Sequence, residues 1–188
     1  MASTELPRIA PQSLDEWHGW LEAHHSTSTG AWVVLARNRT EPVSYEDLVC
    51  EALCWGWIDG LANPLDDQLT MLRFTPRRPD SAWAATNKRR VDDLVAAGRM
   101  RSAGQKLIDD AKASGAWTLL DDAEALVESD ELRAALDAVP DARRHWDTFP
   151  PSARKFGLTQ IAFAKRPETK TRRIAKIVEQ AAANIRPS

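Results

Sequence analysis

The side chains best suited to chemistry in this sequence are gathered between Cys54 and Arg90. This stretch holds three of the eight tryptophans, an aspartate followed by glycine, and a run of arginines. Guanidinium groups form forked hydrogen bonds with carboxylate or phosphate and also stack on aromatic rings, while tryptophan supplies a large flat surface. These residue types together predict a binding site for a small anionic or aromatic molecule.

We expect eight of these residues to converge on one cleft. A helix predicted to begin near Ser81 would direct several of them to one side, because they recur at helical spacing. The two prolines of the segment RFTPRRP restrict the backbone around its arginines, which lowers the entropy lost on binding. The predicted ligand-binding residues are Trp57, Asp59, Arg73, Arg77, Arg78, Trp83, Asn87 and Arg90.

The same residues have structural interpretations, which the sequence leaves open. Tryptophans at helix or strand spacing usually lie in the core, and arginines often pair with local acids. Arg90 and Asp59 would form either a structural ion pair or part of the ligand site. As an enzyme, the protein would use Asp59 as an acid or base with a pKa shifted by burial, and Arg77 or Arg78 would hold the anion.

Familiar cofactor and metal motifs are absent. The sequence contains no GxGxxG, no GxxxxGK[ST] and no GxSxG. The four histidines form no HExxH motif, and Cys50 and Cys54 have no second cysteine pair. We therefore predict no cofactor and no metal. The two cysteines, four residues apart in a helix, are poorly placed for a disulfide and are expected to be reduced, buried thiols.

The elements that must position these residues can be predicted from the hydrophobic pattern. A capping box at 13–16 opens a first helix, and Ser44 caps a second helix that is apolar nearly all round and therefore buried. Three segments have strand character and are expected to pair: Ala31–Arg37, Trp57–Ala62 and Leu69–Phe74.

The pattern changes at Gly115–Asp122, after a helix over Ser102–Ser114, and the chain beyond this break is predicted to be entirely helical. The fold class is therefore α+β: a small antiparallel sheet packed with helices, followed by an all-helical C-terminal portion. We expect an α+β core over residues 1–120 and a helical module over 121–188, packed as one unit. The C-terminal helices are predicted at 130–138, 140–148, 152–164 and 168–184.

The charge is nearly balanced overall, at −2, but it is distributed in blocks. Residues 119–141 hold eight acids against one base, and residues 165–176 hold six bases against one acid. Such blocks are typically solvated helix faces. Nucleic-acid or partner binding through the basic C-terminal helix is a further alternative, although nucleic acid is not the expected partner. The sequence predicts no signal peptide and no membrane insertion, which indicates the cytoplasm, and it gives no indication of oligomeric state.

Several motifs together resemble one protein family. CWGWIDG, RFTPRRP, the pattern WxxxNxxRV and, near the C-terminus, AKRPETKTRRI resemble the YdeI/OmpD-associated family, also called the bacteriocin-protection family. The resemblance extends from about Leu6 to Ile185. It implies a cytoplasmic bacterial protein connected with stress and bacteriocin tolerance, and it implies no agreed catalytic residues.

Overall fold

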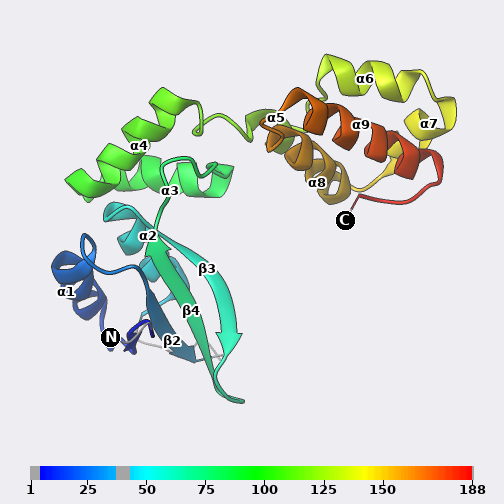
Figure 1. Cartoon of the computed structure of the whole chain (residues 1–188). Helices are drawn as coiled ribbons and strands as arrows, with labels where there is room; N and C mark the ends of the chain where they lie inside the picture. The colour runs from blue at the N-terminus through cyan, green and yellow to red at the C-terminus, as the bar shows by residue number, and fades with distance from the viewer. Residues whose placement is uncertain (1–4, 37–42, 188) are drawn as a thin grey trace. The chain divides into compact units, whose positions relative to one another are not determined.

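The computed structural model describes residues 5–36 and 43–187, and it confirms the α+β fold class (Figure 1). In this part of the chain no helix is both long and apolar enough to cross a membrane. The elements are β1 (Arg8–Ile9), α1 (Leu14–His24), β2 (Ala31–Ala36), α2 (Tyr45–Cys54), β3 (Trp57–Pro64), β4 (Leu69–Pro76), α3 (Ala85–Ala96), α4 (Ser102–Ser114), α5 (Asp121–Glu124), α6 (Asp130–Asp137), α7 (Pro140–Thr148), α8 (Pro151–Ala162) and α9 (Pro167–Ala182).

The chain divides into two compact units. The first unit comprises the described residues up to Ser81 together with Thr86–Ala116, and it contains the sheet and helices α1 to α4. The second unit comprises Ala82–Ala85 and the described residues from Trp117 onward, with helices α5 to α9. A four-residue segment thus belongs to the second unit although the chain on both sides of it belongs to the first.

The sheet has the strand order β1-β2-β4-β3 and is mixed. Strands β2, β4 and β3 pair antiparallel, as predicted, and place Phe74 between Ala31 and Asp59. The difference from the prediction is β1, which pairs parallel with β2. A strand of two residues carries no periodic signal, so the sequence could not indicate it. The last residue of the predicted strand Ala31–Arg37 lies outside the described residues.

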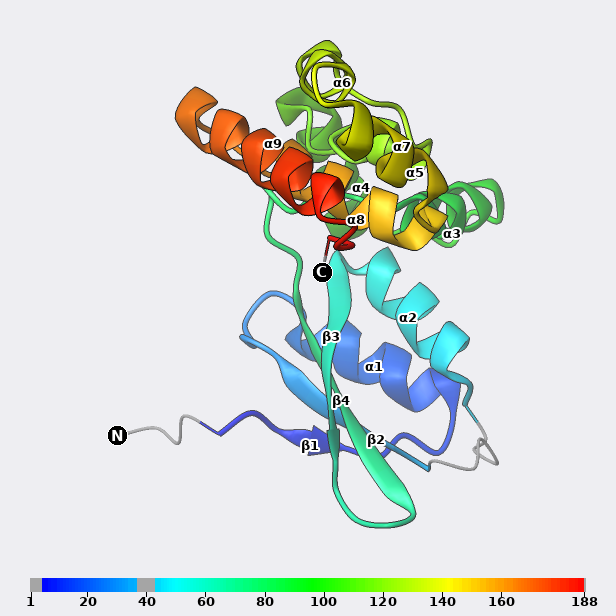
Figure 2. The ribbon, with the colours of Figure 1, turned by 90° about the vertical axis from the view of Figure 1, so that its right-hand side faces the viewer.

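Helices α1 and α2 pack on one face of the sheet (Figure 2). Both begin where the sequence predicts, because the side chains of Ser13 and Ser44 accept hydrogen bonds from the first turns of the helices. Trp17 of α1 is fully buried, its ring lies 5.2 Å from that of Phe74, and its Nε1 donates to the carbonyl oxygen of Leu48 in α2 at 3.1 Å. This layer is the core of the first unit.

Helix α3 begins at Ala85 and not near Ser81. The backbone at Ser81 instead closes a turn, in which its N–H donates to the carbonyl oxygen of Arg78 at 3.0 Å. Trp83 precedes the helix and packs against Trp117 in the second unit, with ring centroids 5.0 Å apart. The helical spacing that was expected to align Trp83 with Asn87 and Arg90 therefore does not apply.

Helix α4 approaches the C-terminal end of α2 so closely that its first turn requires a glycine. A Cβ atom at Gly104 would lie 2.5 Å from the carbonyl oxygen of Cys54 and 2.6 Å from that of Leu53. The absence of a side chain lets the backbones of the two helices touch, which fixes the segment between α3 and α4 beside the end of α2.

The second unit is a helical module with its own core. Trp146 of α7 is fully buried, and apolar residues from α5 to α9 surround it. The helices predicted in this region are confirmed, with ends that shift by at most two residues. Their periodicity was readable because each helix buries one face, and the buried cluster is Ala123, Leu132, Leu136, Ala142, Trp146, Phe149, Leu158, Ile161, Ile174, Ile177 and Ala181.

Candidate functional site

Four of the eight predicted site residues lie together in the first unit, beside two residues that were not predicted. The two unpredicted residues, Tyr45 and Glu46, lie on helix α2. Asp59 lies on strand β3, Arg77 follows β4, and Asn87 and Arg90 lie on α3. We call this group the Asp59 cluster: Tyr45, Glu46, Asp59, Arg77, Asn87 and Arg90.

Arg90 is held by Glu46 and not by Asp59. Its Nε donates to Glu46 Oε1 at 2.7 Å and its Nη2 to Oε2 at 2.5 Å, so the pair is bidentate. Its Nη1 donates to Asn87 Oδ1 at 2.7 Å. The hydrogen bonds from Arg90 lower the pKa of Glu46, and those to Glu46 raise the pKa of Arg90. The guanidinium is thus engaged on both of its edges.

Asp59 and Arg77 form the other half of the cluster. The hydroxyl of Tyr45 donates to Asp59 Oδ2 at 2.7 Å. Burial, followed by this hydrogen bond, raises the pKa of Tyr45 to about 12. Arg77 is only 7% exposed, and burial lowers its pKa to about 10 while the negative charge of Asp59 opposes that change. The charges of two arginines and two carboxylates cancel within the cluster, which is typical of a structural role.

The other four predicted residues lie elsewhere. Trp57 is in the core, where its Nε1 donates to the carbonyl oxygen of His25 at 3.1 Å. Arg73 is exposed, because alternation along β4 places it on the opposite face from Phe74. Arg78 is also exposed and pairs with Asp80 at 3.3 Å. Trp83, the last of the four, belongs to the second unit.

A second polar group in the first unit was not predicted, and it is centred on a buried carboxylate. The side chain of Glu51 is only 8% exposed. Its Oε1 accepts hydrogen bonds from His18 Nδ1 at 2.7 Å and from Trp55 Nε1 at 3.0 Å. Its Oε2 accepts one from Arg99 Nη2 at 3.0 Å. We call this group the Glu51 cluster: His18, His25, Glu51, Trp55, Arg99 and Arg101.

The hydrogen bonds keep Glu51 ionised although it is buried. Burial is the largest single influence and acts to raise the pKa of Glu51, but the hydrogen bonds from His18, Arg99 and Trp55 together lower it below its usual value. Because Nδ1 of His18 donates to a carboxylate, the chemically active lone pair of a neutral His18 ring lies on Nε2.

The ring of Trp55 contacts two further side chains of this cluster. Its ring is contacted by His25, with centroids 4.7 Å apart, and by the guanidinium of Arg101, 5.6 Å from the ring centroid. Arg101 is exposed, and no carboxylate among residues 5–36 and 43–187 forms an ion pair with it. With Arg99 and Arg101 set against Glu51 alone, the cluster presents excess positive charge beside an aromatic ring.

The backbone at the end of α3 places both arginines beside α2. Gly98 has φ of 67°, a left-handed conformation that ends the helix and turns the chain toward α2. Three residues later, the N–H of Arg101 donates to the carbonyl oxygen of Cys54 at 3.2 Å. One signal for this site was present in the sequence: Glu51 is the one charged residue of α2 beyond its first turn, and a buried charge requires partners.

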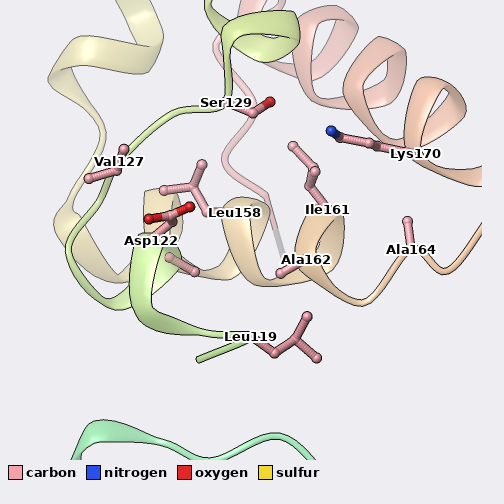
Figure 3. A pocket seen from close by; sticks show the side chains of 10 residues that line it. Leu119, Asp122, Val127, Ser129, Leu158, Ile161, Ala162, Ala164 and Lys170 are labelled. Atoms are coloured by element: carbon pink, nitrogen blue, oxygen red, sulfur yellow. The ribbon is translucent and has the colours of Figure 1, made fainter. Parts of the chain in front are cut away.

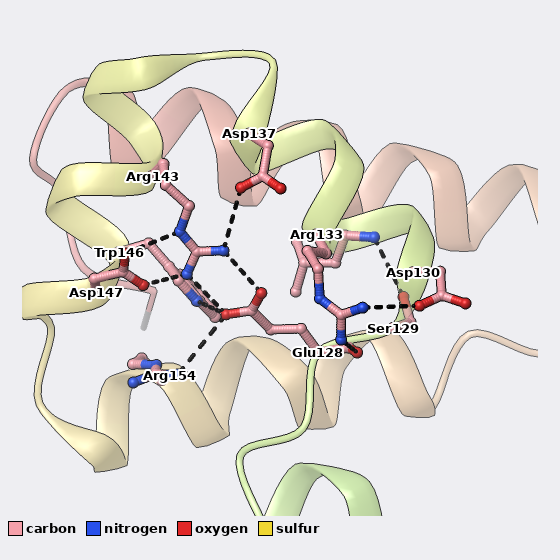
Figure 4. Close-up of polar contacts among 10 residues, drawn as sticks. Glu128, Ser129, Asp130, Arg133, Asp137, Arg143, Trp146, Asp147 and Arg154 are labelled. Carbon is pink, nitrogen blue, oxygen red and sulfur yellow. Dashed lines mark hydrogen bonds and ion pairs between the residues drawn. The ribbon is translucent and has the colours of Figure 1, made fainter.

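The second unit contains a polar cluster of its own, centred on Glu128 (Figure 4). Arg143 donates to both carboxylate oxygens of Glu128, at 2.8 and 2.9 Å, and Trp146 Nε1 donates to Oε1 at 2.8 Å. These hydrogen bonds, that of Arg143 first, lower the pKa of Glu128. Arg154 lies over the ring of Trp146. The cluster ties the loop before α6 to α7 and has a structural role.

Residues suited to a metal ion are not grouped in the described part of the chain, where no three His, Cys, Asp or Glu side chains are arranged to hold one. Both cysteines are unbridged, as predicted. Burial raises the pKa of the Cys54 thiol to about 11, and it also raises the pKa of Cys50. A raised pKa disfavours the reactive thiolate form of both residues. Cys54 is buried as predicted, whereas Cys50 is only partly buried.

The fold and its clusters define an α+β protein with a helical second unit, and each part of the chain matches a different family model. Residues 9–107, more than half of the chain, match the family described as "Domain of unknown function (DUF8412)", and the chain belongs to this family. Residues 125–184 match the family described as "Bacteriocin-protection, YdeI or OmpD-Associated", which confirms the predicted resemblance for this part of the chain. Comparisons with curated proteins and with solved structures found no match.

The motifs on which the resemblance was based fall partly in one matched range and partly in the other. AKRPETKTRRI lies within residues 125–184, where the second unit has helices α6 to α9. CWGWIDG and RFTPRRP lie within residues 9–107, which contain both polar clusters of the first unit.

Proposed function

We propose that the first unit binds a small molecule with a negatively charged group and a flat ring at the Glu51 cluster. The observation that carries the proposal is the Arg101 guanidinium, which lies over the Trp55 ring, is exposed, and has no carboxylate partner in the described residues. An ordered guanidinium recognises carboxylate or phosphate by forked hydrogen bonds. Arg99 and the two histidines lie close enough to Trp55 or Glu51 to add further donors.

Glu51 supports this proposal as a positioning residue. It fixes His18, Trp55 and Arg99 through three hydrogen bonds, so these side chains lose little conformational entropy when a ligand arrives. The Asp59 cluster is less suited to the same ligand, because Glu46 and Asn87 already engage the guanidinium of Arg90. Of these two clusters, it is therefore the Glu51 cluster that has excess positive charge, at Arg99 and Arg101.

The test is a thermal-shift screen of the full chain against small anionic and aromatic molecules, followed by titrations that monitor tryptophan fluorescence. A ligand present at 100 times its dissociation constant adds about 2.7 kcal/mol of stability. Arg101→Ala should weaken binding about tenfold or more, a loss typical of a charged hydrogen bond, without unfolding the domain. Arg78→Ala is the matched control, because Arg78 is exposed and pairs only locally with Asp80.

The variants also separate the Glu51 cluster from the cleft predicted from the sequence. A ligand that loses affinity with Arg78→Ala and keeps it with Arg101→Ala would refute the Glu51 cluster and support the predicted cleft. A ligand lost with both variants would also contradict the proposal, because the two arginines would then act together.

A second candidate function is acid–base catalysis on the bound molecule, with His18 in place of Asp59 as the acid or base. The observation that favours it is the 2.7 Å hydrogen bond from His18 Nδ1 to a buried carboxylate, which orients the ring and leaves Nε2 for a substrate. Each ligand found in the screen would be incubated with the protein and followed by mass spectrometry. A loss of turnover in His18→Asn that exceeds its loss of ligand affinity would support catalysis, and an unchanged ligand would refute it.

The family description supports a cellular role in tolerance to bacteriocins, and we extend this proposal to a stress response in the bacterial cytoplasm. Cells that express the wild-type chain would be compared with cells that express Arg101→Ala, under bacteriocin challenge. Equal survival of these cells and of cells without the protein would contradict the role.

A further inference from the structure

The second unit contains a cavity of about 270 Å³, and the residues that form the three polar clusters described above do not line it (Figure 3). It lies between α5, the segment that leads from α5 to α6, α8, and the first turn of α9. Seven of the ten residues that line it are apolar, and Leu158 and Ile161 of α8 connect it to the buried core. Leu119 and Val127 are large apolar side chains on its rim that remain exposed, at 38% and 48%.

Three polar side chains line the cavity: Asp122, Ser129 and Lys170. The positive charge of Lys170 is already neutralised, because its Nζ donates to Glu131 Oε1 at 2.8 Å. Glu131 also accepts hydrogen bonds from its own backbone and from Ser129, and these contacts, that of Lys170 first, lower its pKa to about 2. Glu131 is therefore ionised throughout the neutral range.

Asp122 differs from Lys170, because no cation in the described residues forms an ion pair with it. Its neighbours Glu124 and Glu128 are paired with Lys155 and Arg143, respectively. The charge left at the mouth of the cavity is therefore negative. An anionic ligand would have to displace Glu131 from Lys170 and would be repelled by Asp122, whereas a cation meets an available carboxylate.

We propose that this cavity binds a small organic cation, with the apolar body of the ligand against Leu158 and Ile161 and its ammonium group at Asp122. The volume is slightly below the range of about 300 to 1,000 Å³ that is typical of small-molecule sites, which favours a compact ligand with one ring or a short chain. The site belongs to the second unit and is independent of the function proposed for the Glu51 cluster.

The experiment uses three probes of one shape and different charge: 2-phenylethylammonium, 2-phenylethanol and 3-phenylpropionate. Each is titrated into the full chain while amide resonances of the residues lining the cavity are followed by NMR. The cation should produce saturable shifts there, the neutral probe should bind more weakly, and the anion should bind most weakly. Equal or tighter binding of the anion would overturn the charge assignment, and the absence of saturable shifts would overturn the site.

Substitutions test the charged group and the apolar wall of the cavity separately. Asp122→Asn should weaken the cation roughly two- to fivefold, the contribution of an exposed ion pair, and leave the neutral probe unchanged. Asp130→Asn is the matched control, because Asp130 is an acid of the same region that pairs with Arg133 and does not line the cavity. The proposal fails if both variants weaken the cation equally or if neither does.

Filling the cavity should abolish binding of the cation and of the neutral probe. Ala162→Leu places a larger side chain in the wall, and Ala164→Leu does so from the turn after α8, in case the first variant unfolds. Binding that survives in a folded variant of either kind would show that the probe sits elsewhere and would overturn the proposal.

Discussion

Replacing Glu51 by glutamine should destabilise the first unit far more than the same change at Glu46, although both acids lie on α2. The side chain of Glu51 is 8% exposed and receives three hydrogen bonds, whereas that of Glu46 is 56% exposed. Glutamine keeps an acceptor for His18 or Trp55 but turns an amide toward Arg99, whose own side chain is 42% exposed and therefore partly screened.

The expected loss of unfolding free energy is about 2 kcal/mol for Glu51→Gln, near the middle of the range for a hydrogen bond to a charged group. It is about 0.5 to 1 kcal/mol for Glu46→Gln, because the Glu46 carboxylate is 56% exposed and solvent screens its ion pair with Arg90. Urea denaturation followed by circular dichroism measures both values, and hydrogen exchange of the α2 amides assigns the loss to the first unit. Equal effects of the two substitutions would refute the view that Glu51 organises the cluster.

The pH dependence of the stability difference between wild type and Glu51→Gln gives a second measurement. The folded protein lowers the pKa of Glu51 from its ordinary value of 4.5. A lowered pKa means that the carboxylate stabilises the folded state above the unfolded pKa, and that this contribution is lost as the pH falls through the folded pKa. The stability difference between wild type and Glu51→Gln should therefore be constant near pH 7 and shrink below about pH 4.5. A difference that grows on acidification would contradict the assignment.

Three further expectations concern other parts of the chain. Gly104→Ala should lower the unfolding free energy by about 1–3 kcal/mol in urea titrations, because its Cβ would overlap the Cys54 carbonyl; an unchanged midpoint would contradict the close approach. Cys50 and Cys54 should react slowly with a thiol reagent in native buffer, since burial raises both thiol pKa values, and fast labelling would refute this. The basic residues of α9, of which Lys170 is paired with Glu131, should give no tight complex with random duplex DNA in gel shifts at low salt; a salt-sensitive complex would overturn this.

The helices of the second unit were readable from the sequence because a single periodicity determines them. Ile174, Ile177 and Ala181 recur at helical spacing and are all buried. Prolines at positions 140, 151 and 167 occupy the first turns of α7, α8 and α9, where a missing backbone N–H costs nothing. The start of α3 was not readable in this way, because the ring of Trp83 packs against Trp117, 34 residues further along the chain.

The partners in the polar clusters were also hard to predict, because they lie far apart in the sequence. Asp59, Arg77, Asn87 and Arg90 were identified as a group because they lie close in the sequence and mix charge with turns. Their partners were assigned incompletely, since Arg90 pairs with Glu46, 44 residues away. The Glu51 cluster joins residues separated by 33 and 48 positions, and no local pattern records which of many charged residues will meet across such a distance. A buried acid in an apolar helix predicts that partners exist without identifying them.

The assignment of Ala82–Ala85 to the second unit has a consequence for any attempt to separate the halves of this protein. The chain passes between the units after Ser81, after Ala85 and again after Ala116. A polypeptide that stops at Ala116 would retain Trp83 and lack Trp117, whose ring contacts it. One that starts at Trp117 would lack Trp83, which is only 3% exposed in the whole chain. The families matched by residues 9–107 and 125–184 follow one another in the sequence, whereas the residues of the two units alternate along the chain. Exchanging one half for that of a relative would have to transfer four residues from inside the other half.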